Sequence, residues 1–177
     1  MLKTSNKMVG YYWLSAQIII LTTHFVPPIQ NRWLVASYDS IPLKLTGYLV
    51  IIIGLIIAFA SLLSLGKNLS PLPDPKDNSK LITNKMYSYC RHPLYLSMLI
   101  ISFGINIILL SVVHVLLFAA LFLILRGKAI YEEKKLVLKF NAYYKYSTKV
   151  PALAKGIFGF DWKVDKRLTK GSNINIS

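Results

Sequence analysis

Long runs without a charged side chain constrain this chain more than any other feature. Residues 45–65 contain no Asp, Glu, Lys or Arg, and 21 helical residues rise about 32 Å, enough to cross the hydrocarbon core of a bilayer. Residues 9–26 are also uncharged and would rise about 27 Å as a helix. We therefore expect two membrane-spanning helices, the second bounded by Pro42 and Gly66.

The third apolar run, residues 94–125, is too long for one span. As a single helix it would measure about 48 Å, against a bilayer core of about 30 Å. Polar and small residues mark a turn near its middle, namely Gly104, Asn106, Ser111 and His114. We expect spans at 94–109 and 112–126. The predicted fold is all-α: a transmembrane bundle of about four spans, the last two a short hairpin, followed by a cytosolic C-terminal helical segment.

The basic residues are distributed unevenly across these spans. Four spans place residues 1–8, 66–93 and 126–177 on one side, and these segments hold 19 of the 21 Lys and Arg residues. The other side holds only Arg32 and Lys44. The positive-inside rule then predicts an integral protein of the cytoplasmic (inner) membrane, with both termini in the cytosol.

The composition agrees with a membrane protein. Hydrophobic residues make up 54% of the chain and charged residues 16%, against about 25% charged in soluble domains. A net charge of +14 is also found in nucleic-acid-binding proteins, but here the basic residues flank apolar runs, so we expect anionic membrane lipids and no nucleic acid as partners. No small-residue cleavage site precedes Pro27, so the first segment is expected to be retained.

Residues 86–95 read M-Y-S-Y-C-R-H-P-L-Y and precede the third span. Arg91 and His92 lie just before a helix that Pro93 is suited to begin. Cations are disfavoured at a helix N-terminus, whereas its free N–H groups attract an anion, so a ligand carboxylate would fit here. The alternative is a lipid phosphate held by an interfacial arginine, with an aromatic belt of Tyr87, Tyr89 and Tyr95.

Residues 126–140, after the fourth span, carry Glu132 and Glu133. Helical spacing puts Glu132 on one face with Lys128, Leu136 and Phe140. A carboxylate there would accept hydrogen bonds from an amine or a cationic ligand, so the two segments together would suit a zwitterionic amino-acid group. The alternative is a set of exposed ion pairs, which contribute little stability.

These motifs together have a recognisable order. The motifs are, in order, R-H-P-L-Y, E-E-x-x-L-x-x-x-F, Y-x-x-Y and V-P. The segment between Leu72 and Pro151 that carries them resembles the superfamily of isoprenylcysteine carboxyl and phosphatidylethanolamine methyltransferases. The resemblance implies S-adenosylmethionine as cofactor, a lipid-soluble or prenylated substrate, and cofactor-binding segments at 66–93 and 127–160. With Arg91, the implied cofactor residues are Lys80, Leu81, Ile82, Tyr87, His92, Pro93, Leu94, Tyr95 and Glu132.

The chain departs from this pattern where isoprenylcysteine enzymes carry a substrate-contacting Arg, four residues before the cofactor Glu. Lys128 occupies that position and Arg126 lies two residues earlier, so we assign substrate positioning to this pair. Lys85 and Ser97 also replace glycines that are common in the family. The pocket is therefore expected to differ in shape from that of the prenylcysteine enzymes.

No His, Cys or carboxylate pair has metal-ligand spacing, so no metal site is expected. His24 and His114 are interpreted as packed or interfacial residues, the alternative being a proton relay. Cys90 is a lone thiol. Two other functions remain open at this level: a membrane reductase that uses a nicotinamide cofactor, and a non-catalytic lipid-binding protein.

Overall fold

The computed structural model describes residues 2–24, 26–27, 40–70, 72, 75, 78–157 and 159–165. These residues form helices and connecting segments without a strand, which confirms the all-α class for the described chain. The order is α1 (Leu2–Thr23), α2 (Ile41–Leu65), η1 (Gly66–Asn68), η2 (Lys85–Ser88), α3 (Pro93–Leu109), α4 (Val112–Lys139) and α5 (Tyr143–Lys149).

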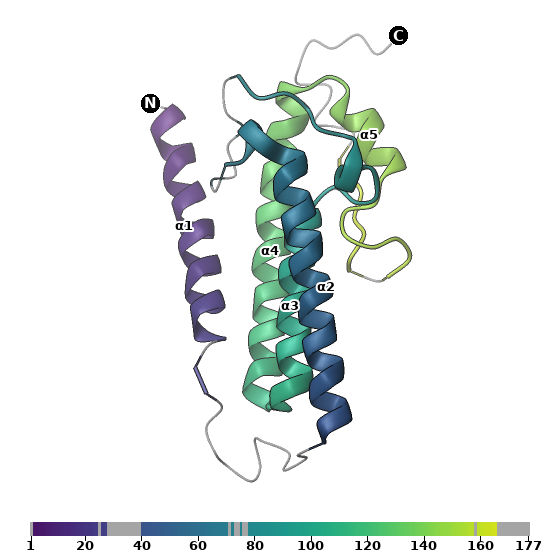
Figure 1. Cartoon of the computed structure of the whole chain (residues 1–177). Helices are drawn as coiled ribbons and strands as arrows, with labels where there is room; N and C mark the ends of the chain where they lie inside the picture. The colour runs from purple at the N-terminus through teal and green to yellow at the C-terminus, as the bar shows by residue number, and fades with distance from the viewer. Residues whose placement is uncertain are drawn as a thin grey trace.

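Helices α2, α3 and α4 lie side by side, and α1 stands along α4 (Figure 1). The start of α1, the end of α4 and α5 are all at one end of the molecule, which we call the polar end (Figure 1). Helix α2, continued by η1, and helix α4 are each 28 residues long and apolar enough to cross a membrane. The apolar parts of α1 and α3 are shorter, at Met8–Thr23 and Pro93–Leu109.

Three helix boundaries differ from the predictions. Helix α1 ends at Thr23 rather than at residue 26. Helix α2 begins at Ile41, so Pro42 lies inside its first turn, where a missing N–H costs nothing. Helix α4 starts at Val112 as expected but continues beyond residue 126 to Lys139, because the Lys, Glu and Leu residues that follow are good helix formers.

Helices α3 and α4 are joined by a tight turn, at the place where the sequence predicted one. Leu110 adopts a left-handed conformation, with φ 45° and ψ 43°, and its N–H donates to the carbonyl oxygen of Asn106. Ser111 then leads into α4. This two-residue connection reverses the chain and sets the start of α3 beside the second half of α4.

Helix α2 packs closely on α3 through small residues. Gly47, Gly54 and Ser61 are the buried residues of α2, and they recur every seven positions on one face. A Cβ atom on Gly47 would lie only 2.9 Å from the carbonyl oxygen of Gly104, so the backbones meet here. Several large side chains of α2, such as Ile52 and Phe59, point outward, as expected for a lipid-facing helix.

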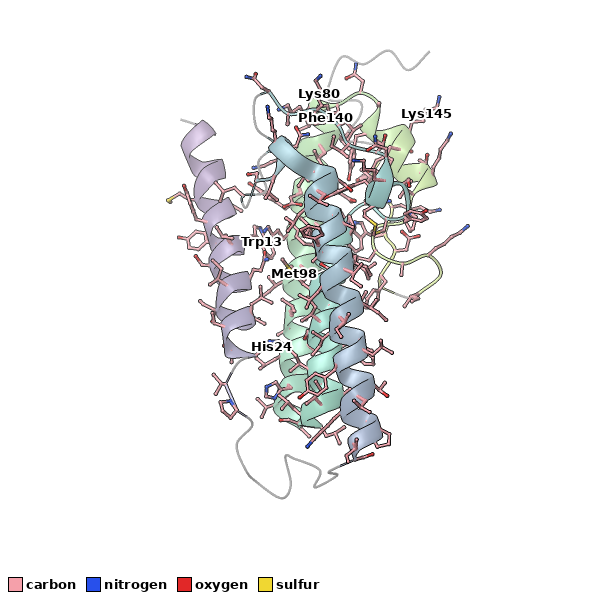
Figure 2. All side chains as sticks on the ribbon, viewed as in Figure 1. Trp13, His24, Lys80, Met98, Phe140 and Lys145 are labelled. Atoms are coloured by element: carbon pink, nitrogen blue, oxygen red, sulfur yellow. The ribbon has the colours of Figure 1, made fainter. Side chains whose placement is uncertain are left out.

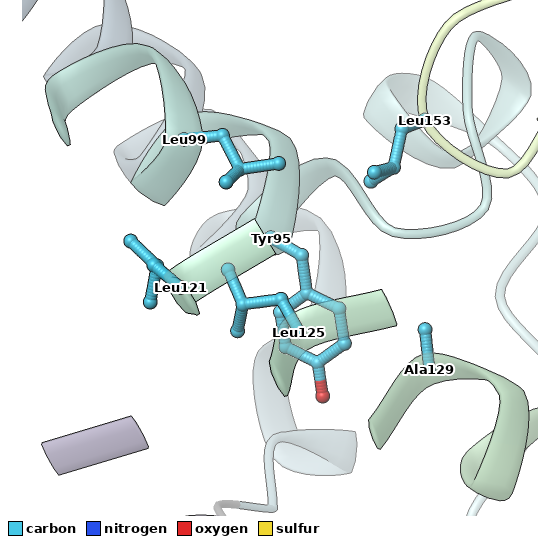
Figure 3. Packing of buried hydrophobic residues seen from close by; sticks show 6 residues of the cluster. All are labelled: Tyr95, Leu99, Leu121, Leu125, Ala129 and Leu153. Atoms are coloured by element: carbon cyan, nitrogen blue, oxygen red, sulfur yellow. The ribbon is translucent and has the colours of Figure 1, made fainter. Parts of the chain in front are cut away.

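The buried apolar core lies toward the polar end. It joins α3 and α4 to the segment after α5 through Tyr95, Leu99, Leu121, Leu125, Ala129 and Leu153 (Figure 3). The segment after α5 is hydrogen-bonded to the residues before α3: Arg91 N–H donates to the Pro151 carbonyl and His92 N–H to the Ala152 carbonyl. This pairing holds the R-H-P segment against the end of the helices.

Candidate active site

A cavity of about 520 Å³ opens where the polar end meets the helices. Its walls come from α2, the segment 68–82, the start of α3, the second half of α4, and α5. Figure 2 shows Lys80 and Phe140, which both line it, close to the polar end, and Met98, another lining residue, further along the helices. The cavity therefore runs from the polar end into the apolar part of the molecule.

Most residues predicted from the sequence line this one cavity. They are Lys80, Leu81, Ile82, Tyr87, Arg91, His92, Leu94, Tyr95, Lys128 and Glu132. Segments more than forty residues apart in the sequence are thus brought together by the α3–α4 hairpin. The convergence supports the predicted positions, while their roles remain predictions.

Two predicted residues lie elsewhere. Pro93 is buried at the start of α3 and does not line the cavity. Arg126 lines a separate, smaller hollow with Trp162, and its guanidinium lies 5.9 Å from the centre of that indole ring. Helical rotation explains this, since Arg126 and Lys128 are about 200° apart around α4.

Arg91 is enclosed by protein acceptors. Its Nε donates to Glu133 Oε1 at 2.7 Å, Nη1 to the carbonyls of Ser147 and Val150, and Nη2 to that of Trp162. Only 1% of the side chain is exposed. The expectation that this guanidinium receives a ligand carboxylate therefore needs correction: although Arg91 lines the cavity, its donors tie α4 to the C-terminal segment.

Glu133, for which an exposed ion pair was one of the predicted alternatives, is the centre of this network. Its carboxylate accepts hydrogen bonds from Arg91 Nε, Tyr143 OH, Trp162 Nε1 and His92 Nε2. Burial alone would raise the pKa of Glu133, but the hydrogen bonds and charges of His92 and Arg91 bring it below the ordinary value. Glu133 is thus a buried carboxylate whose charge is stabilised by Arg91 and His92.

A sequence signal for Glu133 did exist. Ala129, Glu133 and Val137 are all buried and recur every fourth residue on α4. A carboxylate on such an apolar stripe needs an internal cation. Applied to the sequence, that rule would have directed Glu133 toward the core and toward Arg91.

Glu132 faces the cavity from the neighbouring position. Tyr95 OH donates to Glu132 Oε1, and His92 Nδ1 lies 3.9 Å from Glu132 Oε2. Burial raises the pKa of Glu132, against the lowering effects of His92, Tyr95 and Lys128. A cationic or amine-bearing ligand beside this carboxylate would favour its ionised form.

Lys128 is buried one turn before Glu132 and links α1 to the cavity. Its Nζ donates to Gln17 Oε1 at 2.8 Å and lies 5.4 Å from the centre of the Tyr95 ring. The Gln17 amide in turn donates to the sulfur of Met98. The cavity therefore holds a lysine ammonium group where its polar part meets its apolar part.

The apolar part of the cavity extends between the helices. It is lined by Leu14 of α1, by Ala58, Leu62 and Leu65 of α2, and by Met98 and Ile101 of α3. At the other end, Tyr146 OH donates to the carbonyl oxygen of Tyr87 and closes the wall between η2 and α5. One cavity thus combines a charged, hydrogen-bonding region with a lining that suits a hydrocarbon chain.

The arrangement defines a helical membrane enzyme with a half-polar cavity at the end of its bundle. Residues 43–142 match the model of the phospholipid methyltransferase family. The chain is also 26% identical, over 157 residues, to the protein-S-isoprenylcysteine O-methyltransferase B of Arabidopsis thaliana, covering 84% of this chain and 76% of that protein.

Because the family match covers more than half of the chain, the protein belongs to the phospholipid methyltransferase family. It is therefore a methyltransferase and an integral membrane protein. The superfamily predicted from the R-H-P-L-Y and E-E-x-x-L motifs is confirmed. Among the residues that the structure describes, no three His, Cys, Asp or Glu side chains are grouped as metal ligands.

Proposed function

We propose that this enzyme takes its methyl group from S-adenosylmethionine and transfers it to a lipid-soluble acceptor within the cavity. The observation that carries the proposal is the division of the cavity into a polar part, at Glu132 and His92, and an apolar part between α1, α2 and α3. A charged cofactor and a lipid chain need these two environments side by side.

The polar residues have distinct roles in this proposal. Glu132 accepts hydrogen bonds from the amino group of the cofactor, while Tyr87, Leu81 and Ile82 enclose its remaining surface. The anionic end of the cofactor lies near Lys80, which is exposed at the cavity wall. When bound, the cofactor supplies a methyl group that its sulfonium charge already activates, so the protein acts mainly by alignment and exclusion of water.

Lys128 is assigned to the acceptor. Its ammonium group lies near the apolar lining and is held in place by Gln17. A single charge on a flexible stem can attract a carboxylate or a phosphate without the bidentate geometry of arginine. One of two candidate acceptors is therefore similar to that named for the plant relative, a prenylated cysteine.

A second candidate acceptor is a phospholipid amine, which the description of the family favours. Its headgroup carries both a phosphate, suited to Lys128, and an amine that would lie close to Glu132. Membrane vesicles that contain phosphatidylethanolamine, compared with a farnesylated cysteine derivative, distinguish the two acceptors by which of them becomes methylated.

The proposed membrane arrangement follows the predicted spans. Four crossings, by α1, α2, α3 and the first half of α4, place residues 66–93 and 127–160 in the cytosol and form one integral domain in the cytoplasmic membrane. The charged residues of α4 after residue 125 support this, because they extend the helix beyond its apolar part. The cavity would then face the cytosol and open toward the bilayer.

Calorimetric titration of the detergent-solubilised protein with S-adenosylhomocysteine tests the cofactor site. We expect saturable binding that weakens at least about tenfold in Glu132→Gln, since loss of a charge-assisted hydrogen bond costs about 1.5–3 kcal/mol. Asp165→Asn, an exposed carboxylate away from this cavity, is the matched control and should bind like the wild type. Equal binding by Glu132→Gln, or none by the wild type, contradicts the proposal.

A further inference from the structure

The imidazole ring of His92 lies between two carboxylates. Its Nε2 is 3.0 Å from Glu133 Oε1, and its Nδ1 is 3.9 Å from Glu132 Oε2. The ring stacks on Tyr95, with 5.4 Å between centroids and planes 4° apart, and Trp162 lies at 6.0 Å. These contacts fix the plane of the ring and leave each nitrogen with a defined direction.

The contact with Glu133 determines which nitrogen carries a hydrogen. Glu133 already accepts hydrogen bonds from Arg91, Tyr143 and Trp162, so it is ionised and offers only acceptors. His92 Nε2 must therefore be the donor in its contact with Glu133. In the neutral ring, Nδ1 then bears a lone pair on the side of Glu132, which is a cavity residue.

The ring has an acidic neighbour on each side. The carboxylates of Glu132 and Glu133 flank it, so positive charge that develops on the ring during the transfer lies between two acidic groups. The other titratable groups near this pair are Arg91 and Tyr143, which bond Glu133, and Tyr95 and Lys128, which lie against Glu132. Arg91 already donates to Glu133 and to three carbonyl groups. Because Glu133 is paired with Arg91, Glu132 is the carboxylate that can offset a positive charge on the ring.

We infer that His92 is the proton acceptor of the methyl transfer and that Glu133 is the positioning residue that holds Nδ1 ready for it. The inference rests on the proposed function and narrows the acceptor to an amine, thiol or hydroxyl group, which loses a proton when methylated. The acceptor heteroatom bonds the methyl carbon, its proton moves to Nδ1, and the electron pair of the broken carbon–sulfur bond stays on sulfur. A carboxylate acceptor releases no proton and would not need His92.

His92→Asn tests this role. The asparagine oxygen can accept a hydrogen bond close to the position of Nδ1 but cannot take up a proton at neutral pH. With S-adenosylmethionine and either phosphatidylethanolamine or a polyprenyl phenol, kcat should fall about 100-fold or more, the usual contribution of general-base catalysis. Binding of S-adenosylhomocysteine should stay within about threefold of the wild type. The matched control is His24→Asn, at a buried, hydrogen-bonded histidine that does not line the cavity, and it should leave kcat unchanged.

A kinetic measurement on the wild-type enzyme needs no variant. In single turnovers with an amine or phenol acceptor, methyl transfer should be slower in deuterium oxide than in water, because a proton leaves the acceptor heteroatom during the transfer. Equal rates in the two solvents, a His92→Asn variant with the wild-type kcat, or methylation restricted to a farnesylated cysteine carboxylate would each overturn the inference. Failure of the wild type to methylate any acceptor contradicts the proposed function instead.

Discussion

Glu133 joins four parts of the chain through one carboxylate. Its partners come from the segment before α3, from α5 and from the C-terminal segment, and only 3% of its side chain is exposed. The charge pair with Arg91 is therefore buried, and Arg91 donates to three further carbonyl groups. Removing one partner of such a pair leaves an uncompensated charge inside the protein, which is more costly than the pair itself.

Glu133→Ala should lower the free energy of unfolding by about 3–5 kcal/mol, because Arg91 then loses its counter-charge in the interior. The shift is measured by thermal denaturation in detergent. Glu132→Ala is the control, since that carboxylate faces the cavity and its loss should cost less stability while weakening ligand binding. Similar melting temperatures for Glu133→Ala and the wild type would show that the network does not hold the polar end together.

Cys90 is predicted to be unreactive in the folded protein. Burial raises the pKa of its thiol from 9.0 to about 11, so about one thiol in a thousand is ionised at pH 8. Iodoacetamide should label it slowly until the protein is unfolded. Because the folded state favours the protonated thiol, its contribution to stability is present below about pH 9 and is lost as the pH rises toward 11. Fast labelling at pH 8 would contradict this environment.

At the residue scale, the sequence predicted which side chains line the cavity better than it predicted their partners. Spacing put Glu132 and Lys128 on one face of a helix, and both line the cavity. The partners of Arg91 could not be found in this way, because three of its four acceptors are carbonyl groups of α5 and the C-terminal segment. Carbonyl groups leave no mark in a sequence.

At the element scale, close packing of α2 on α3 supports the wall of the cavity. A Cβ on Gly104 would lie 2.8 Å from the carbonyl oxygen of Gly47, and one on Gly54 would lie 2.6 Å from Ile101 Cγ1. A backbone oxygen cannot move aside as a flexible side chain can. Because Ile101 also lines the cavity, the spacing of these helices controls its width.

Gly104→Val should separate α2 from α3 and destabilise the protein by at least about 1–3 kcal/mol, the usual cost of overpacking. Thermal denaturation in detergent measures the loss. Ala119→Val places the same side chain on the exposed face of α4 and should have almost no effect. If both variants melt alike, the two helices are not held as closely as the structure indicates.

Helix lengths were predicted well where the apolar pattern ends sharply and poorly where it fades. The turn after α3 was placed within a residue or two, because a 32-residue apolar run cannot be one span. Helix α4 continues past the predicted end of the span at residue 126, since charged residues mark the end of an apolar layer but not the end of a helix. Membrane thickness limits the length of the segment that crosses the bilayer, whereas helix propensity limits the length of the helix itself.

At the scale of the whole molecule, the distribution of Lys and Arg predicts which end of the bundle faces the cytosol. The proposed arrangement puts the cavity, α5 and the exposed Lys145 on one side of the membrane, and the start of α2 on the other. The family match and the two long apolar helices support membrane insertion. Orientation rests on charge alone, so it needs a direct test.

Single cysteines in a Cys90→Ser background provide this test. Ile41→Cys, at the exposed start of α2, should react with a membrane-impermeant maleimide in intact cells. Lys145→Cys, on the exposed face of α5, should react only after the membrane is permeabilised. The reverse pattern would place the cavity outside the cytosol, away from the cofactor supply that the proposed function requires.

Transfer of a radiolabelled methyl group from S-adenosylmethionine into the lipid fraction tests the central claim most directly. Membranes that contain the wild-type protein should label an organic-soluble product, while membranes with equal amounts of folded Glu132→Gln should label it at least about tenfold more slowly, because the carboxylate that holds the cofactor is lost. Equal labelling by the two proteins, or no labelling by the wild type across prenylcysteine, phospholipid and polyprenyl phenol acceptors, would contradict the account.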